Sequence, residues 1–115
     1  MSDLRTARIL VVDDTPENIA VLAGLLKQEY TVLAALNAQQ ALHILEAKEL
    51  PDLILLDVMM PQIDGYQLCK KIKAEPRTSH IPIIFVTAKN QIEDEQMGFD
   101  IGAVDYITKP ISPPI

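Results

Sequence analysis

Five short, mainly apolar runs divide this chain, and no other feature of the sequence restricts its fold as strongly. Apolar runs of about four to eight residues, without regular polar alternation, are typical of β-strands that are buried on both faces. We therefore predict five strands, at Ala7–Val12, Thr31–Leu36, Asp52–Asp57, Ile81–Thr87 and Ala103–Ile107.

Helical patterns fill the intervals between these runs. In the first interval Thr15 is a suitable N-cap and Pro16 suits the first helical position. Four residues then define one apolar helix face, namely Ile19, Leu22, Leu25 and Leu26. The later helices each begin with a capping residue that is followed three positions on by Gln or Glu. These pairs are Asn37 with Gln40, Asp64 with Gln67, and Asn90 with Glu93, and Gly102 is expected to end the last helix.

Strands that alternate with helices predict βαβ units with right-handed crossovers, and hence a parallel, doubly wound α/β sheet. A chain of 115 residues is expected to form one domain of this kind. In such sheets ligands bind at the carboxyl ends of the strands, where the strand order reverses. The residues at those ends are therefore the candidates for a functional site.

Polar side chains lie at the carboxyl ends of four predicted strands. Asp13 and Asp14 follow the first strand, Asp57 ends the third, Thr87 ends the fourth, and Lys109 follows the fifth. We expect these groups to converge, which would bring three carboxylates together. Two like charges about 4 Å apart repel by roughly 1 kcal/mol in water and about 4 kcal/mol at an effective dielectric of 20. A divalent cation would remove this repulsion, and oxygen ligands without His or Cys favour Mg²⁺, Mn²⁺ or Ca²⁺ over zinc. A shallow site with few carboxylates and several waters suits Mg²⁺ best.

The same groups suit phosphoryl transfer, which needs an in-line nucleophile, a metal ion and fixed positive charge. Asp57 can act as the nucleophile and form an acyl phosphate. The Thr87 hydroxyl, the Ala88 backbone N–H and the Lys109 ammonium can hold the phosphoryl oxygens.

Charge and composition argue against several other classes of protein. The net charge of −6 disfavours a broad nucleic-acid surface, which needs Lys and Arg. The single cysteine, Cys69, excludes an internal disulfide and fits a cytoplasmic setting, and we expect it in the core. No apolar stretch approaches the roughly 20 residues of a membrane span. His43 and His80 are expected to be exposed.

Four motifs at the strand ends give the chain a family resemblance. They are VVDD at 11–14, LLDVMMP at 55–61 with Asp64–Gly65 after it, VTA at 86–88 and DYITKP at 105–110. Together and in this order they resemble the receiver domain of bacterial response regulators in two-component signal transduction. The resemblance extends from about Ala7 to Pro110 and implies a flavodoxin-like sheet with strand order 2-1-3-4-5.

The resemblance also implies a role for each site residue. Asp57 resembles the phosphoacceptor of the family. Asp14 and Asp57 resemble its direct Mg²⁺ ligands, with Asp13 assisting through water and the backbone carbonyl of Met59 as a further ligand.

On the far side of the site, Thr87 and Tyr106 resemble the switch pair, in which the hydroxyl moves towards the phosphoryl group and the aromatic ring changes rotamer. Lys109 resembles the phosphate-binding lysine. The family also leads us to expect a cis Lys109–Pro110 bond, which costs roughly 0.5–1 kcal/mol.

The resemblance implies partners as well. A sensor histidine kinase or phosphotransfer protein would supply the phosphoryl group, and an output domain outside this chain would respond. Family members carry a fifth helix after the Lys-Pro turn, so we expect residues 1–115 to be a single receiver domain that is truncated at its C-terminus. Truncation would expose apolar surface on one face of the sheet and favour dimerisation.

The main alternative is a small Mg²⁺-dependent phosphatase with an aspartyl-phosphate intermediate, which would share the nucleophile and the lysine. Such an enzyme usually needs a second acid two residues after the nucleophile, where this chain has Met59. An interaction domain that is never phosphorylated is a third possibility, and the complete set of acids, Thr and Lys argues against it. Taken singly, Asp13–Asp14 could be a capping pair, Lys109 a surface lysine and Tyr106 an ordinary strand residue.

Overall fold

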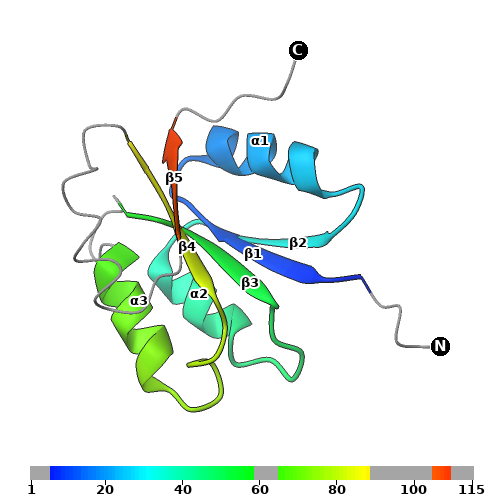
Figure 1. Cartoon of the computed structure of the whole chain (residues 1–115). Coiled ribbons are helices and arrows are strands. Elements are labelled where there is room, and N and C mark those ends of the chain that lie inside the picture. The colour runs from blue at the N-terminus through cyan, green and yellow to red at the C-terminus, as the bar shows by residue number, and fades with distance from the viewer. Residues whose placement is uncertain (1–5, 59–64, 89–104, 110–115) are drawn as a thin grey trace.

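A five-stranded parallel sheet forms the centre of the protein, whose computed structural model describes residues 6–58, 65–88 and 105–109 (Figure 1). The strand order is β2-β1-β3-β4-β5. The strands are β1 (Arg8–Val12), β2 (Thr31–Ala35), β3 (Leu53–Asp57), β4 (Ile83–Ala88) and β5 (Asp105–Lys109). The helices of this part are α1 (Pro16–Leu26), α2 (Ala38–Ile44) and α3 (Gly65–Ala74). The α/β class, the parallel sheet and the predicted strand order are therefore confirmed.

Each face of the sheet carries an apolar layer, because successive strand residues point to opposite sides. Figure 1 shows α1 on one face and α2 with α3 on the other. The layer beneath α2 and α3 takes from the strands Leu10, Val12, Ile54, Leu56, Ile83 and Phe85. The layer beneath α1 takes Ile9, Val11, Leu55 and Val86. Strands buried on both faces explain why the apolar runs of the sequence are continuous.

Helix α1 buries less of its apolar face than its sequence predicts. Leu22 is buried, and Ile19 and Leu26 pack against the same layer. Leu25, which the sequence places on the same apolar helix face, is 41% exposed. None of the helices in the described part of the chain is long and apolar enough to span a membrane.

The start of β4 lies two residues later than predicted. Ile81 is buried at 1% exposure, but its N–H donates to the Thr78 carbonyl at 3.1 Å and closes a turn. Pro82 follows and has no N–H to donate to a neighbouring strand. Ile81 therefore belongs to the core without belonging to the sheet, and its apolar side chain misled the prediction.

The last strand also differs from the prediction, which placed it at Ala103–Ile107. Its observed pairing with β4 runs from Ile84 opposite Asp105 to Ala88 opposite Lys109. Thr108 and Lys109 are therefore part of β5 rather than residues that follow it. The prediction bounded the strand by apolar side chains, whereas main-chain pairing with β4 sets its ends. The predicted fourth helix, at residues 90–102, lies outside the described residues.

Helix α2 begins as the sequence predicts. The Asn37 side chain accepts a hydrogen bond from the Gln40 N–H at 2.8 Å, which is the expected N-cap contact. The Gln40 side-chain oxygen in turn accepts from the Leu36 N–H at 2.8 Å, one residue before the cap. The two contacts together satisfy donors on both sides of the helix start. Of the second predicted pair, Asp64 with Gln67, Asp64 lies outside the described residues.

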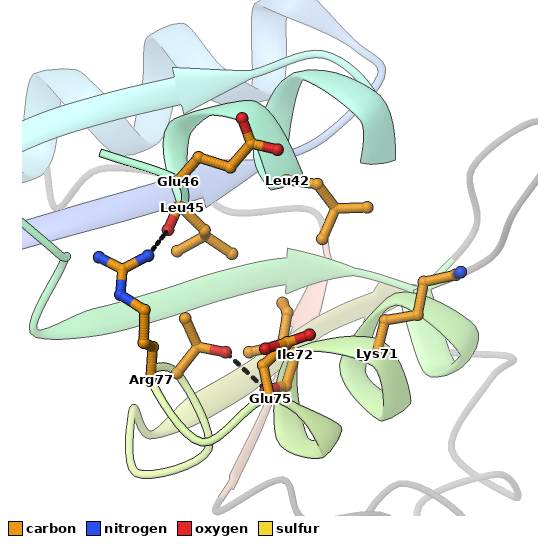
Figure 2. A pocket seen from close by; sticks show the side chains of 8 residues that line it. Leu42, Leu45, Glu46, Lys71, Ile72, Glu75 and Arg77 are labelled. Carbon is orange, nitrogen blue, oxygen red and sulfur yellow. Dashed lines mark hydrogen bonds between the residues drawn. The ribbon is translucent and has the colours of Figure 1, made fainter. Parts of the chain in front are cut away.

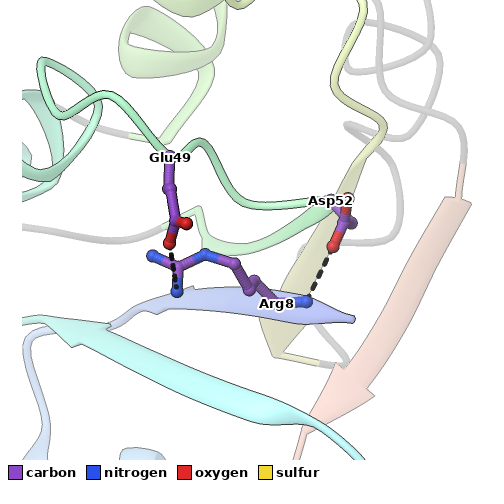
Figure 3. Close-up of polar contacts among 3 residues, drawn as sticks. All are labelled: Arg8, Glu49 and Asp52. Carbon is purple, nitrogen blue, oxygen red and sulfur yellow. Dashed lines mark hydrogen bonds and ion pairs between the residues drawn. The ribbon is translucent and has the colours of Figure 1, made fainter. Parts of the chain in front are cut away.

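The amino ends of β1 and β3 are joined by an exchange of hydrogen bonds (Figure 3). The Arg8 N–H donates to an Asp52 carboxylate oxygen at 2.8 Å, and the Asp52 N–H donates to the Arg8 carbonyl at 2.7 Å. The Arg8 guanidinium also lies 3.5 Å from the Glu49 carboxylate. These contacts fix the register of the two central strands at the edge opposite to the predicted site.

Arg77 joins the end of α2 to the loop before β4, beside a cavity of about 340 Å³ (Figure 2). Its guanidinium donates to the Leu45 carbonyl at 3.0 Å and to the Ala47 carbonyl at 2.7 Å. We expect Arg77→Ala to lower the free energy of unfolding by about 1–3 kcal/mol, because it leaves two carbonyls without a charged donor. Urea unfolding followed by circular dichroism measures the change. Lys71→Ala, on the same cavity, is the control and should change it by less than about 0.5 kcal/mol.

Cys69 lies on the buried face of α3, in the core, as predicted. Burial raises the pKa of its thiol from 9.0 to about 11, although the nearby Lys73 lowers it in part. At pH 8 such a thiol has roughly 100-fold less thiolate than an exposed one, so we expect iodoacetamide to label native protein at least about 100-fold more slowly than unfolded protein. Equal labelling rates in the two states would contradict the buried position of Cys69.

Candidate functional site

Three aspartates meet where the two central strands of the sheet end. In the pairing of β1 with β3, Val12 lies opposite Leu56. The next residues along each strand, Asp13 and Asp57, therefore reach the same level of the sheet. One carboxylate oxygen from each of Asp13, Asp14 and Asp57 lies within 4.8 Å of the others. The structure thus brings together the three acids that the sequence placed at the strand ends.

The three carboxylates differ in their access to solvent. Asp13 and Asp57 are only 1% and 2% exposed, whereas Asp14 is exposed. The two buried carboxylates thus lie in surroundings with a lower effective dielectric than water, which strengthens the repulsion between their negative charges. The exposed side of Asp14 leaves the cluster open to small ions and to an incoming group.

The turn that follows β1 fixes the position of Asp13. Its N–H donates to the Ala35 carbonyl at 3.1 Å, which continues the pairing of β1 with β2 by one residue. Its side-chain oxygen accepts from the Thr15 N–H at 2.9 Å. Both contacts hold the backbone so that the Asp13 and Asp14 side chains leave the sheet at its carboxyl edge.

The cluster has the donor set of a hard divalent cation. It offers carboxylate oxygens and neither imidazole nor thiolate, which suits Mg²⁺, Mn²⁺ or Ca²⁺ better than zinc. A cation would also offset the repulsion among three close negative charges. Within residues 6–58, 65–88 and 105–109, no second group of three acidic, His or Cys side chains meets this spacing. The cluster is therefore compatible with metal binding.

Helix α3 closes against the end of β3 through a glycine. The Gly65 N–H donates to the Val58 carbonyl at 2.8 Å, and the Val58 N–H donates to the Val86 carbonyl at 3.4 Å. A side chain at Gly65 would overlap the Asp57 carbonyl oxygen and lie 2.9 Å from the Val58 Cα. This role of Gly65 was not predicted from the sequence. The available indication was the position of Gly65, eight residues after Asp57.

The remaining predicted site residues are placed by their backbone. Because Asp57 lies opposite Val86 in the sheet, Thr87 is one residue beyond that level. Ala88 lies opposite Lys109, and Tyr106 lies opposite Phe85. The side chains of Thr87, Tyr106 and Lys109 lie outside the described part of the structure, as do Met59 and Pro110 entirely.

Neither histidine belongs to the cluster. His43 on α2 and His80 before β4 are both exposed, as the sequence predicted. The described chemistry of the site thus rests on carboxylates alone.

Comparison with known proteins places this arrangement in a family. The family model described as "Response regulator receiver domain" matches residues 9–114. Among curated proteins, a "Probable cyclic di-GMP phosphodiesterase" of Vibrio cholerae is 49% identical over all 115 residues, which cover 26% of its length. "Response regulator PleD" of Caulobacter vibrioides is 47% identical over 107 residues, 92% of this chain and 23% of the relative. The chain thus spans about a quarter of the length of these two relatives.

Solved structures agree with the sequence comparison. Chemotaxis protein CheY4 of Vibrio cholerae superposes with a TM-score of 0.86 at 28% identity, over 94% of this chain and 90% of its own. The N-terminal domain of a response regulator receiver protein from Methanoculleus marisnigri gives 0.79 at 37% identity, over 90% of this chain and 84% of its own. From the matched sequence, the shared fold and the motifs at the strand ends, we conclude that this chain belongs to the receiver domain family of response regulators.

Proposed function

We propose that this receiver domain is switched by transfer of a phosphoryl group to Asp57. The observation that carries the proposal is the position of Asp57, which is 2% exposed at the end of β3 with two further carboxylates within 4.8 Å. Burying a carboxylate among like charges costs free energy, which a bound cation offsets or which the protein retains for a reaction at that group. The proposal is also supported by the sequence around Asp57, because LLDVMMP at 55–61 resembles the motif that carries the phosphoacceptor in the family.

In the proposed reaction a carboxylate oxygen of Asp57 attacks the phosphorus of a phosphohistidine on the partner protein. An O–P bond forms as the P–N bond breaks, and the electron pair of that bond stays on the imidazole nitrogen. Water later attacks the phosphorus, the bond between phosphorus and the Asp57 oxygen breaks, and inorganic phosphate leaves as the free carboxylate is restored. The domain thus catalyses steps of its own modification and acts as a regulatory domain rather than as an enzyme on a small substrate.

The aspartate cluster is the proposed Mg²⁺ site. Asp14 and Asp57 are the proposed direct ligands, with Asp13 assisting through water and the Met59 carbonyl completing the protein ligands. When bound there, Mg²⁺ would neutralise charge on the phosphoryl oxygens. The hydrogen bond from the Thr15 N–H to the Asp13 carboxylate holds the Asp13 side chain at this site.

Residues of β4 and β5 are the proposed contacts of the phosphoryl group. The Thr87 hydroxyl, the Ala88 N–H and the Lys109 ammonium would bind its oxygens, because their backbones lie at or just beyond the level of Asp57. Tyr106 would follow the movement of Thr87, since it lies two residues before the strand partner of Thr87. Phosphorylation would then shift the population of two conformations that a partner distinguishes.

The proposed partners are a sensor histidine kinase or phosphotransfer protein in the cytoplasm and an output domain. Relatives of this chain include a probable phosphodiesterase and the DNA-binding regulator RpaA of Synechocystis, of which the chain covers 26% and 43%. The additional length of these relatives leaves room for output domains of different kinds. Which of them accompanies this receiver is a property of the whole protein.

Incubation with Mg²⁺ and acetyl phosphate, followed by intact-mass analysis, tests the proposal. We expect the mass to rise by one phosphoryl group, and EDTA to prevent the rise. Parallel incubation with p-nitrophenyl phosphate tests the phosphatase alternative, for which Met59 is an unsuitable proton donor. No phosphoryl mass, or sustained hydrolysis of the ester, would contradict the proposed function.

A further inference from the structure

Thr15 stands at the start of α1 but does not use its side chain there. It occupies the N-cap position with extended backbone angles, φ −105° and ψ 110°, yet its hydroxyl makes no capping hydrogen bond. The N–H groups of Asn18 and Ile19 donate to the Thr15 carbonyl at 3.0 and 3.3 Å, and not to its hydroxyl. Pro16 has no N–H to offer. The helix therefore leaves the Thr15 hydroxyl available for another contact.

Both donors of Thr15 are directed at the aspartate cluster. Its N–H donates to Asp13 Oδ1 at 2.9 Å, and its hydroxyl lies 3.5 Å from Asp14 Oδ1. The first contact is a strong hydrogen bond to a charged acceptor, and the second is at the outer limit of one. One residue thus touches both of the acids that follow β1.

The two contacts have different consequences. Asp13 is buried and is also held through its own N–H by Ala35, so its position does not depend on the Thr15 side chain. Asp14 is exposed, and a free carboxylate on the surface samples several rotamers. The Thr15 hydroxyl favours the rotamers that keep Asp14 near Asp13 and Asp57.

We propose that Thr15 is a positioning residue for the metal site, whose hydroxyl pre-orients the Asp14 carboxylate. This inference rests on the proposed function, because it concerns the proposed Mg²⁺ ligands. A ligand that is already oriented loses less conformational entropy when the ion binds. Partners of metal ligands typically contribute about 10- to 100-fold in affinity, and the long contact here places Thr15 at or below the lower end of that range.

Titration with Mn²⁺, with the free ion measured by electron paramagnetic resonance, tests the inference without any phosphorylation assay. We expect Thr15→Val to weaken Mn²⁺ binding by about three- to tenfold and Thr15→Ser to restore it. Thr15→Val should leave the urea midpoint of the metal-free protein unchanged, because no capping bond is lost. Thr31→Val makes the same chemical change at the start of β2, the opposite edge of the sheet, and should alter neither quantity.

Three results would overturn the inference. Equal Mn²⁺ affinity in wild type and Thr15→Val would remove the positioning role and leave the proposed function intact. A lower urea midpoint with unchanged affinity would make Thr15 a helix cap instead. Absence of Mn²⁺ binding by the wild type would overturn the proposed metal site together with the role of Thr15.

Discussion

We expect that replacing Asp57 by asparagine abolishes phosphorylation of the protein by acetyl phosphate in the presence of Mg²⁺. The amide that replaces the carboxylate has nearly the same volume but carries no nucleophilic oxygen anion, so the acyl phosphate cannot form. The substitution also removes one of three close negative charges, two of which are buried. We therefore expect Asp57→Asn to raise the free energy of unfolding of the metal-free protein by about 1–4 kcal/mol. Loss of labelling in a protein that is more stable cannot be attributed to misfolding.

Asp52→Asn is the matched control for this experiment. Asp52 lies just before β3, at the end opposite to Asp57, and its exposed carboxylate accepts a hydrogen bond from Arg8. An amide oxygen can accept the same bond, so the fold is preserved. We expect this variant to take up the phosphoryl group as the wild type does. Labelling of Asp57→Asn at the wild-type rate would show that another residue is the acceptor.

The largest expected loss of stability comes from Gly65→Ala. The added methyl group would overlap the Asp57 carbonyl oxygen and approach the Asp57 carbonyl carbon and the Val58 Cα to 2.9 Å each. All three atoms belong to the backbone, so relief requires that α3 and the end of β3 move apart. Overpacking of this kind costs about 1–3 kcal/mol and occasionally more, and we expect about 3 kcal/mol here. Urea unfolding gives the value directly.

Gly24→Ala provides the opposite result from the same chemical change. Gly24 lies within α1, and a methyl group there would meet no atom within 4 Å. Alanine favours the helix, so this variant should gain about 0.5–1 kcal/mol. The contrast between the two variants separates the close approach at Gly65 from the general effect of replacing glycine. Equal stabilities of the two variants would contradict the described packing of α3 on β3.

Gly65→Ala should also affect the site, because two of the three atoms that the methyl group approaches belong to Asp57, the proposed phosphoacceptor. A small shift of a reacting group can cost about 100-fold in rate. We therefore expect the folded fraction of this variant to be phosphorylated more slowly than the wild type.

The order of the elements could be predicted because each central strand is buried on both faces and is therefore continuously apolar. The convergence of Asp13, Asp14 and Asp57 followed from the same reasoning, since parallel strands present their carboxyl ends at one edge. The ends of the strands could not be predicted equally well. An apolar side chain indicates that a residue is buried but not that it belongs to a strand, and Ile81 is buried in a turn. Lys109 is charged and yet belongs to β5, because pairing with Ala88 extends the strand.

Contacts between distant segments were beyond the reach of the sequence. Nothing near Arg77 indicates that its guanidinium binds carbonyls 32 and 30 residues earlier, just after α2. At Thr15 the sequence predicted a helix cap, and the position is correct although the hydroxyl contacts Asp14 instead of the helix. The local sequence pattern predicts that the Thr15 hydroxyl binds the start of α1. In the folded protein the neighbouring Asp14 carboxylate is its partner instead.

The central claim is that Asp57 is the phosphoacceptor, and the chemistry of the acyl phosphate offers its most direct test. Borohydride reduces an acyl phosphate to the alcohol and so converts a phosphorylated aspartate into homoserine, which marks the position permanently. Protein treated with acetyl phosphate and Mg²⁺, reduced, digested and analysed by tandem mass spectrometry should carry this change at Asp57 alone. The change at Asp13, Asp14 or any other carboxylate, or its absence from every peptide, would contradict the account.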